Sequence, residues 1–96
     1  MPEHDSLDEV RRHIDRLDQD IVALLAERAR FVSAAATFKT SEAAVVVPER
    51  VEAIIAKVRA QALTHDADPG LMEAIYRGMI AQFIAYEQGE WRKKNA

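Results

Sequence analysis

The chain has 96 residues, which predict a single domain with room for a hydrophobic core but with stability to gain from oligomerisation. Its formal net charge of −3 at pH 7 shows no excess of positive charge of the kind that binds nucleic acid. Its lack of cysteine excludes disulfides and thiolate metal sites. No apolar run approaches the length of a signal core or a membrane span, so we expect a cytoplasmic protein with no membrane partner.

The first predicted helix covers residues 7–38. Ser6 suits its N-cap, with Glu9 three residues further on as in a capping box. Apolar residues recur at alternating steps of three and four, which is the helical period. They are Leu7, Val10, Ile14, Leu17, Ile21, Leu24, Phe31, Ala35 and Phe38.

This helix is too long for a lone domain of the chain's size. About 32 residues span roughly 48 Å, whereas a compact chain of about 100 residues has a diameter of only about 35 Å. We therefore expect part of the apolar seam to be covered by a second copy, in a helical homodimer with the long helices side by side.

The rest of the chain predicts one loop and two further helices. Pro48 suits the first position of a helix over 48–63, and Asp68 followed by Pro69 suits the start of a helix over 69–92. The segment AAVVV is too short and solitary to found a sheet. The predicted fold is all-α, with three helices in one domain over 1–96 and a lid-like loop over 39–47.

Three cations share one stripe of the first helix with mostly apolar residues: Arg11, Arg28 and Lys39. Desolvating a cation is costly unless an anion meets it. Arg28 and Lys39 lie about 16 Å apart along the axis, a gap that two long side chains can close on a small molecule. Arg11 lies about 25 Å from Arg28, so it is expected to serve a different site, which in an antiparallel dimer is the partner's.

Two further polar residues fit the same ligand. Gln88 interrupts the apolar stripe of the third helix, where its amide can bond a ligand oxygen in a dry pocket. Arg50, at the start of the second helix, can grip a carboxylate with two parallel hydrogen bonds. Together with the three cations they predict a buried pocket for a small molecule that carries at least two carboxylates.

The sequence predicts no metal or other cofactor. Three histidines, His4, His13 and His65, are scattered over a terminus, a helix face and a turn, and are read as solvated. No serine has a nearby histidine or an elbow motif. An enzyme built from these residues would act by positioning and electrostatics, without covalent or metal catalysis.

Each candidate residue also has a simpler explanation. Arg28 can pair with an acid across a helical dimer, and Arg11 can be a solvated flank residue. Lys39 suits a helix C-terminus, Arg50 an exposed first turn, and Gln88 can satisfy a neighbouring helix. A non-catalytic helical dimer, such as an adaptor or a regulatory domain that binds metabolites, is therefore the alternative of a different class.

The segment LDEVRRHIDRLDQDIVALLAERARFV, followed by FK and PERV, resembles the all-helical class of chorismate mutases. The resemblance covers roughly residues 7–92 and implies intertwined dimers with three helices per chain. It implies that Arg11 enters the partner's site and that Arg28 and Arg50 hold substrate carboxylates. Lys39 and Gln88 would bond the ether oxygen of the enolpyruvyl group, whose negative charge grows as the C–O bond breaks.

Three positions depart from the mutase pattern. Val47 and Val51 stand where such mutases have an aspartate and a glutamate, the latter engaging the ring hydroxyl at C4, and Ile84 replaces a serine. This more apolar site, and the loop FKTSEAAVVVPERV, are similar to those of isochorismate-pyruvate lyases. The resemblance thus implies a lyase with weak mutase activity. Chorismate mutase is the alternative, and an amino-substituted substrate also stays open.

Overall fold

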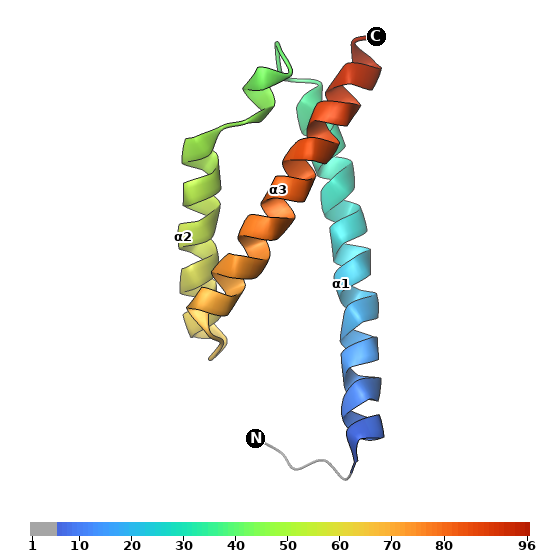
Figure 1. The fold of residues 1–96 in the computed structure, drawn as a ribbon, viewed down its shortest axis with the longest axis vertical. Helices are drawn as coiled ribbons and strands as arrows, with labels where there is room; N and C mark the ends of the chain where they lie inside the picture. Colours follow the sequence, from blue (N-terminus) through green and yellow to red (C-terminus); the bar gives the residue numbers. More distant parts are fainter. Residues whose placement is uncertain (1–5) are drawn as a thin grey trace. The chain divides into compact units, whose positions relative to one another are not determined.

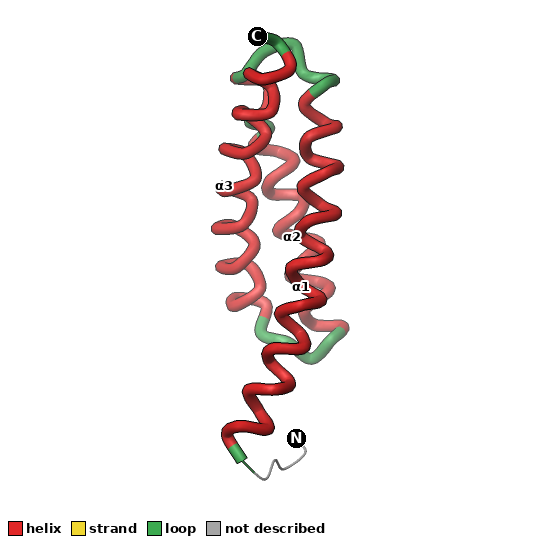
Figure 2. Tube along the Cα trace, turned by 90° about the vertical axis from the view of Figure 1, so that its right-hand side faces the viewer, coloured by secondary structure: helices red, strands yellow, loops and turns green. Residues whose placement is uncertain are grey.

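A computed structural model describes residues 6–96 as an all-helical chain (Figure 1). Its elements in order are α1 (Leu7–Ala36), the 3-10 helix η1 (Ala43–Val45), α2 (Pro48–Thr64) and α3 (Pro69–Lys94). Figure 2 shows loops but no strand between these helices, which confirms the all-α class for residues 6–96. The chain divides after Phe31 into two units. His4 lies outside the described residues.

In the first unit, α1 begins as the sequence predicts. The Ser6 hydroxyl accepts a hydrogen bond from the backbone N–H of Glu9 at 3.1 Å, which confirms Ser6 as the N-cap. Most of the large apolar side chains of this unit are between 47% and 70% exposed, whereas Val10 and Leu25 are half-buried. The exposed ones are Leu7, Ile14, Leu17, Ile21, Val22, Leu24 and Phe31. The helix therefore carries an apolar surface that its own chain leaves open to solvent.

The second unit begins at Val32, within the last turns of α1. The helix itself ends at Ala36, two residues before the predicted limit of 38. The backbone N–H groups of Thr37, Phe38 and Lys39 each bond the carbonyl three residues earlier, at 3.0 to 3.2 Å. The last turn therefore tightens to the 3-10 pattern and the α-helix stops at Ala36. α2 and α3 run slightly further than predicted, to Thr64 and Lys94.

The connection between α1 and α2 is partly helical. The Ser41 hydroxyl accepts from the backbone N–H of Ala44 at 3.1 Å, which starts η1. Val45 is buried, whereas Val46 and Val47 stay exposed. The Glu42 carboxylate, just before η1, accepts a hydrogen bond from the Arg92 guanidinium on α3. Within the second unit, the segment is thus fastened to α3.

α2 and α3 form an antiparallel pair joined by a short turn (Figure 1). Pro48 and Pro69 occupy the first helical turns, and the Asp68 carboxylate accepts from the backbone N–H of Gly70 at 2.9 Å, so both predicted starts are confirmed. The core of the pair is small and aliphatic. Its buried side chains are Ile55, Val58, Ala62 and Ile80.

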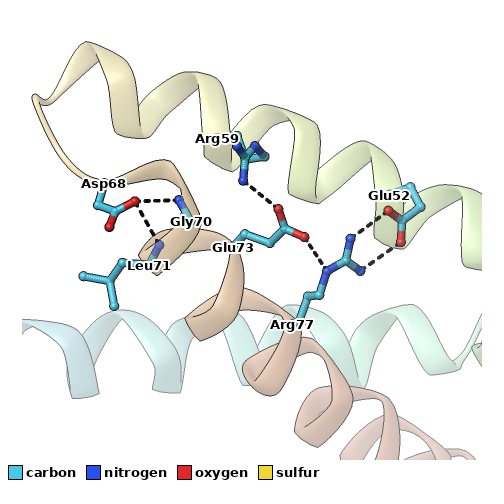
Figure 3. A network of polar contacts seen from close by, with 7 residues as sticks. All are labelled: Glu52, Arg59, Asp68, Gly70, Leu71, Glu73 and Arg77. Atoms are coloured by element: carbon cyan, nitrogen blue, oxygen red, sulfur yellow. Dashed lines mark hydrogen bonds and ion pairs between the residues drawn. The ribbon is translucent and has the colours of Figure 1, made fainter.

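A surface network of charges ties α2 to α3 (Figure 3). The Arg77 guanidinium donates to both oxygens of Glu52, at 3.0 and 2.9 Å, and to Glu73 at 2.7 Å. Arg59 donates to the other Glu73 oxygen at 2.8 Å. Hydrogen bonds from Arg77 are the main reason that the pKa of Glu52 and the pKa of Glu73 lie below their usual value of 4.5.

Candidate active site

Lys39 is held at both ends of its backbone. Its N–H donates to the carbonyl of Ala36 at 3.2 Å, and its own carbonyl accepts from the indole Nε1 of Trp91 at 3.1 Å. The indole lies in the last part of α3 and is half-buried. The turn that carries Lys39 is therefore fixed against the C-terminal part of α3.

The side chain of Lys39 points to the same part of α3. Its Nζ lies 3.3 Å from Oε2 of Glu87, and Glu87 is only 9% exposed. Sequence reasoning did not single out Glu87. The signal was present, because Glu87 follows Phe83 by one turn and Ile80 by two, which places an acid on the apolar face of α3.

Gln88 follows directly on α3 and is half-buried. Within residues 6–96 its amide makes no hydrogen bond to another group of the chain, so its donors and its acceptor are available to a ligand. Ile84 lies one turn before it and is also half-buried. The structure thus brings Lys39 to the segment of α3 that carries Gln88.

Arg50 lies in the first turn of α2 with Val51, and Val47 is the N-cap residue before this turn. The backbone N–H groups of Arg50 and Val51 both donate to the carbonyl of Val47, at 3.0 and 3.2 Å. The three residues are therefore joined through the backbone where α2 begins. The Arg50 guanidinium is exposed and has no acid partner within residues 6–96. It is therefore open to a carboxylate ligand.

The acid next to Val51 in the sequence does not stand in for the missing glutamate. The Glu52 carboxylate is on the side of α2 that faces α3, where both its oxygens accept from Arg77 (Figure 3). Val51 itself is half-buried. The start of α2 therefore offers the cation of Arg50, the apolar side chain of Val51 and the exposed acid Glu49, while Glu52 is already engaged by a guanidinium.

Arg11 and Arg28 belong to the first unit. α1 is one continuous helix from Leu7 to Ala36, so the two arginines stay about 25 Å apart along its axis. Arg11 is exposed and has no acid partner within the described residues, and Arg28 is half-buried. The rigid spacing means that these two side chains of one chain do not grip the same small molecule.

Residues 6–96 contain no group of three or more histidine, cysteine, aspartate or glutamate side chains placed to hold a metal ion. Among the described helices, none has the length and apolar character needed to cross a membrane.

Comparison with known proteins places these residues in a family. The model of chorismate mutase type II matches residues 10–88. The chain belongs to the type II chorismate mutase family. The isochorismate pyruvate lyase of Pseudomonas aeruginosa is 38% identical over 87 residues, which cover 91% of this chain and 86% of that protein. The resemblance inferred from the sequence is confirmed, and the chain is an enzyme of pericyclic chemistry.

The chorismate mutase match contains every residue predicted for the site. It begins one residue before Arg11 and ends on Gln88, so it also includes Glu87. For an enzyme of this family, cations and neutral donors without a metal are a sufficient set of groups, because a pericyclic rearrangement needs a folded substrate and charge stabilisation at the breaking bond.

Proposed function

We propose that this enzyme is an isochorismate-pyruvate lyase with weak chorismate mutase activity. The observation that carries the proposal is that valine, not an acid, stands at positions 47 and 51 around the start of α2. Val51 stands where the resembled mutases have a glutamate for the C4 hydroxyl, and the adjacent Glu52 is bound by Arg77. A lyase has no use for that acid, because the hydroxyl of isochorismate is at C2. The lyase relative at 38% identity supports the same choice.

The reaction is a single pericyclic step. The C–O bond between the ring and the enolpyruvyl group breaks while hydrogen moves from ring C2 to the enolpyruvyl methylene, which gives salicylate and pyruvate. Lys39 and Gln88 donate hydrogen bonds to the ether oxygen, and they are the catalytic residues because negative charge grows on that atom. One such donor is typically worth about 10²- to 10³-fold in rate.

The remaining site residues bind and enclose the substrate. Arg28 and Arg50 hold its two carboxylates, since guanidinium and carboxylate pair through two parallel hydrogen bonds. Val47, Val51 and Ile84 line the ring with apolar surface. Removing water from the site strengthens the charge interactions inside it.

The active form in this proposal is a homodimer. The exposed apolar side chains of α1 support it, because a row of apolar side chains that are mostly 47% to 70% exposed along a helix calls for a covering partner. In the dimer Arg11 enters the partner's site, which agrees with its lack of an acid partner within the described residues. The cytoplasmic location expected from the sequence stays a prediction.

The proposal is tested by offering the purified protein isochorismate and chorismate separately. Salicylate is followed by fluorescence and prephenate by acid conversion to phenylpyruvate. We expect kcat/KM for salicylate formation to exceed kcat/KM for prephenate formation, with both measurable. A much higher kcat/KM on chorismate would instead support the second candidate, chorismate mutase. That candidate is the activity for which the matched family is named.

A further inference from the structure

We propose that Glu87 is a positioning residue that holds the Lys39 ammonium in place for the reaction. The inference rests on the proposed catalytic role of Lys39, and it adds a residue that acts through Lys39 without touching the substrate. Its starting observation is the ion pair of 3.3 Å between Nζ of Lys39 and Oε2 of Glu87.

The two ends of this pair differ in their surroundings. The Lys39 side chain is 26% exposed, so it reaches solvent or a ligand, whereas the Glu87 side chain is 11% exposed. Within residues 6–96, Oε2 of Glu87 has no hydrogen-bond partner, although it is fully shielded from solvent. The ion pair with Lys39 is therefore the interaction that compensates this buried oxygen.

Lys39 also needs an orienting group. A lysine side chain has four carbons of flexible stem and loses considerable rotamer freedom when it is fixed. The backbone of Lys39 is already fixed by Ala36 and by the Trp91 indole. Glu87 fixes the other end of the side chain, so the ammonium is placed before any substrate arrives.

The position of Glu87 on α3 connects this pair to the second proposed donor. Glu87 precedes Gln88 directly, so the pair sets the Lys39 ammonium at the level of Gln88 along α3. Both donors are proposed to bond the same ether oxygen, and a misplacement of about 1 Å in such an arrangement can cost about 100-fold in rate. Glu87 is the residue that keeps the spacing of the two donors constant.

The other acids near this end of α3 do not share the role. Glu90 accepts from the Ser33 hydroxyl at 2.9 Å and pairs with Lys93, and Glu42 pairs with Arg92. The Ser33–Glu90 contact fastens the end of α1 to α3, and the Glu42–Arg92 pair fastens the segment before η1 to α3. Only the Glu87 pair, among the ion pairs of residues 6–96, contains a residue of the proposed catalytic set.

The test is a double-mutant cycle on the full-length enzyme. Glu87→Gln keeps the shape of the side chain and removes its charge, so the buried position tolerates it better than alanine. We expect Glu87→Gln to lower kcat by about 10- to 100-fold, with KM changed less than about twofold. In a Lys39→Ala background the same substitution should change kcat little, because the group that Glu87 positions is gone.

Two further variants keep the cycle decisive. Glu73→Gln removes an acid of the surface network of α2 and α3, and it is the matched control that should leave kcat unchanged. Glu87→Asp returns the carboxylate on a shorter stem and should recover part of the lost kcat, which settles the case if Lys39→Ala is too slow to measure. Circular dichroism confirms that each variant is folded.

The outcomes separate this inference from the proposed function. Kinetics are measured on whichever of isochorismate and chorismate the wild type converts faster, so a mutase result overturns the lyase proposal and leaves the cycle intact. An unchanged kcat in folded Glu87→Gln would overturn the role of Glu87. An equal loss with and without Lys39 would overturn it too, because Glu87 would then act independently of Lys39.

Discussion

At the scale of single residues, Val51 is the position that we propose separates the lyase reaction from the mutase reaction. In the proposed site this half-buried valine would give the ring of a substrate an apolar contact and no acceptor. Glu52 is one residue further on, yet its direction is set by Arg77 on α3. Glu52 therefore does not supply the acid that position 51 lacks. A substitution of Val51 should change the preference of the enzyme between the two substrates.

We expect Val51→Glu to shift the enzyme towards chorismate. The new carboxylate would face the substrate ring, where it can accept from a C4 hydroxyl and finds no partner on isochorismate. An unpaired acid in a desolvated site costs about 1–3 kcal/mol, so kcat/KM on isochorismate should fall by about 10- to 100-fold. The measurement is the ratio of kcat/KM on the two substrates. Val51→Gln is the uncharged control, and equal losses on both substrates would contradict the assignment of position 51.

At the scale of elements, the pairing of α2 with α3 depends on few buried side chains and on a surface network. Glu52, Glu73 and Arg77 are all solvent-accessible, so each ion pair contributes little by itself. The network nevertheless has geometry that single surface pairs lack, because Arg77 binds Glu52 through two parallel bonds and Glu73 through a third.

This network should make the free energy of unfolding decrease as the pH falls into the acid range. Because the folded pKa values of Glu52 and Glu73 lie below 4.5, the stabilisation is complete above pH 4.5 and is lost as the pH falls through the lowered values. Arg77→Met should therefore lower the urea midpoint at pH 7 and converge on the wild type in acid. Lys57→Met, an exposed α2 residue with no ion pair within residues 6–96, is the control. A midpoint difference of the same size in acid would count against the network.

The elements also show what local sequence can and cannot predict. Ser6, Pro48 and Asp68 were predictable as helix starts, because a cap is made within three or four residues. The burial of Val45 but not of Val46 and Val47 was not predictable, since it depends on how η1 lies against α3.

The same limit applies to the candidate site. The cations and Gln88 are predicted as site residues from spacing and from resemblance, and their roles stay predictions. The pairing of Lys39 with Glu87 was not predictable, because the two residues are 48 positions apart in the sequence and meet only through the packing of the α1 end on α3. An acid on an apolar helix face, such as Glu87, indicates that a buried charge needs a partner. The sequence does not show which cation that partner is.

At the scale of the whole molecule, the proposed site draws on a second copy of the chain. Arg11 and Arg28 are held about 25 Å apart by one continuous helix, so a site that uses both draws them from different chains. The exposed apolar seam of α1 provides the surface for that association. Because a twofold dimer is symmetric, each chain would give one Arg11 and receive one.

This exchange predicts that two inactive variants restore each other. In a mixed dimer of Arg11→Ala with Gln88→Ala, the site built on the Arg11→Ala chain has its own Gln88 and receives an intact Arg11 from the partner. Random pairing makes half of the dimers mixed, so about a quarter of all sites should be complete. The measurement is the activity of the two proteins after they are unfolded together and refolded, compared with each refolded alone.

The matched control pairs Lys39→Ala with Gln88→Ala. In the proposed dimer both residues act in the site of their own chain, so every site in the mixed dimer would keep one defect and no activity should return. Light scattering would show whether the species in each mixture has twice the 10.8 kDa mass of the chain. If the Arg11→Ala mixture formed such dimers and stayed inactive, Arg11 would act within its own chain, and the 25 Å spacing along α1 would then require Arg28 to lie outside that site.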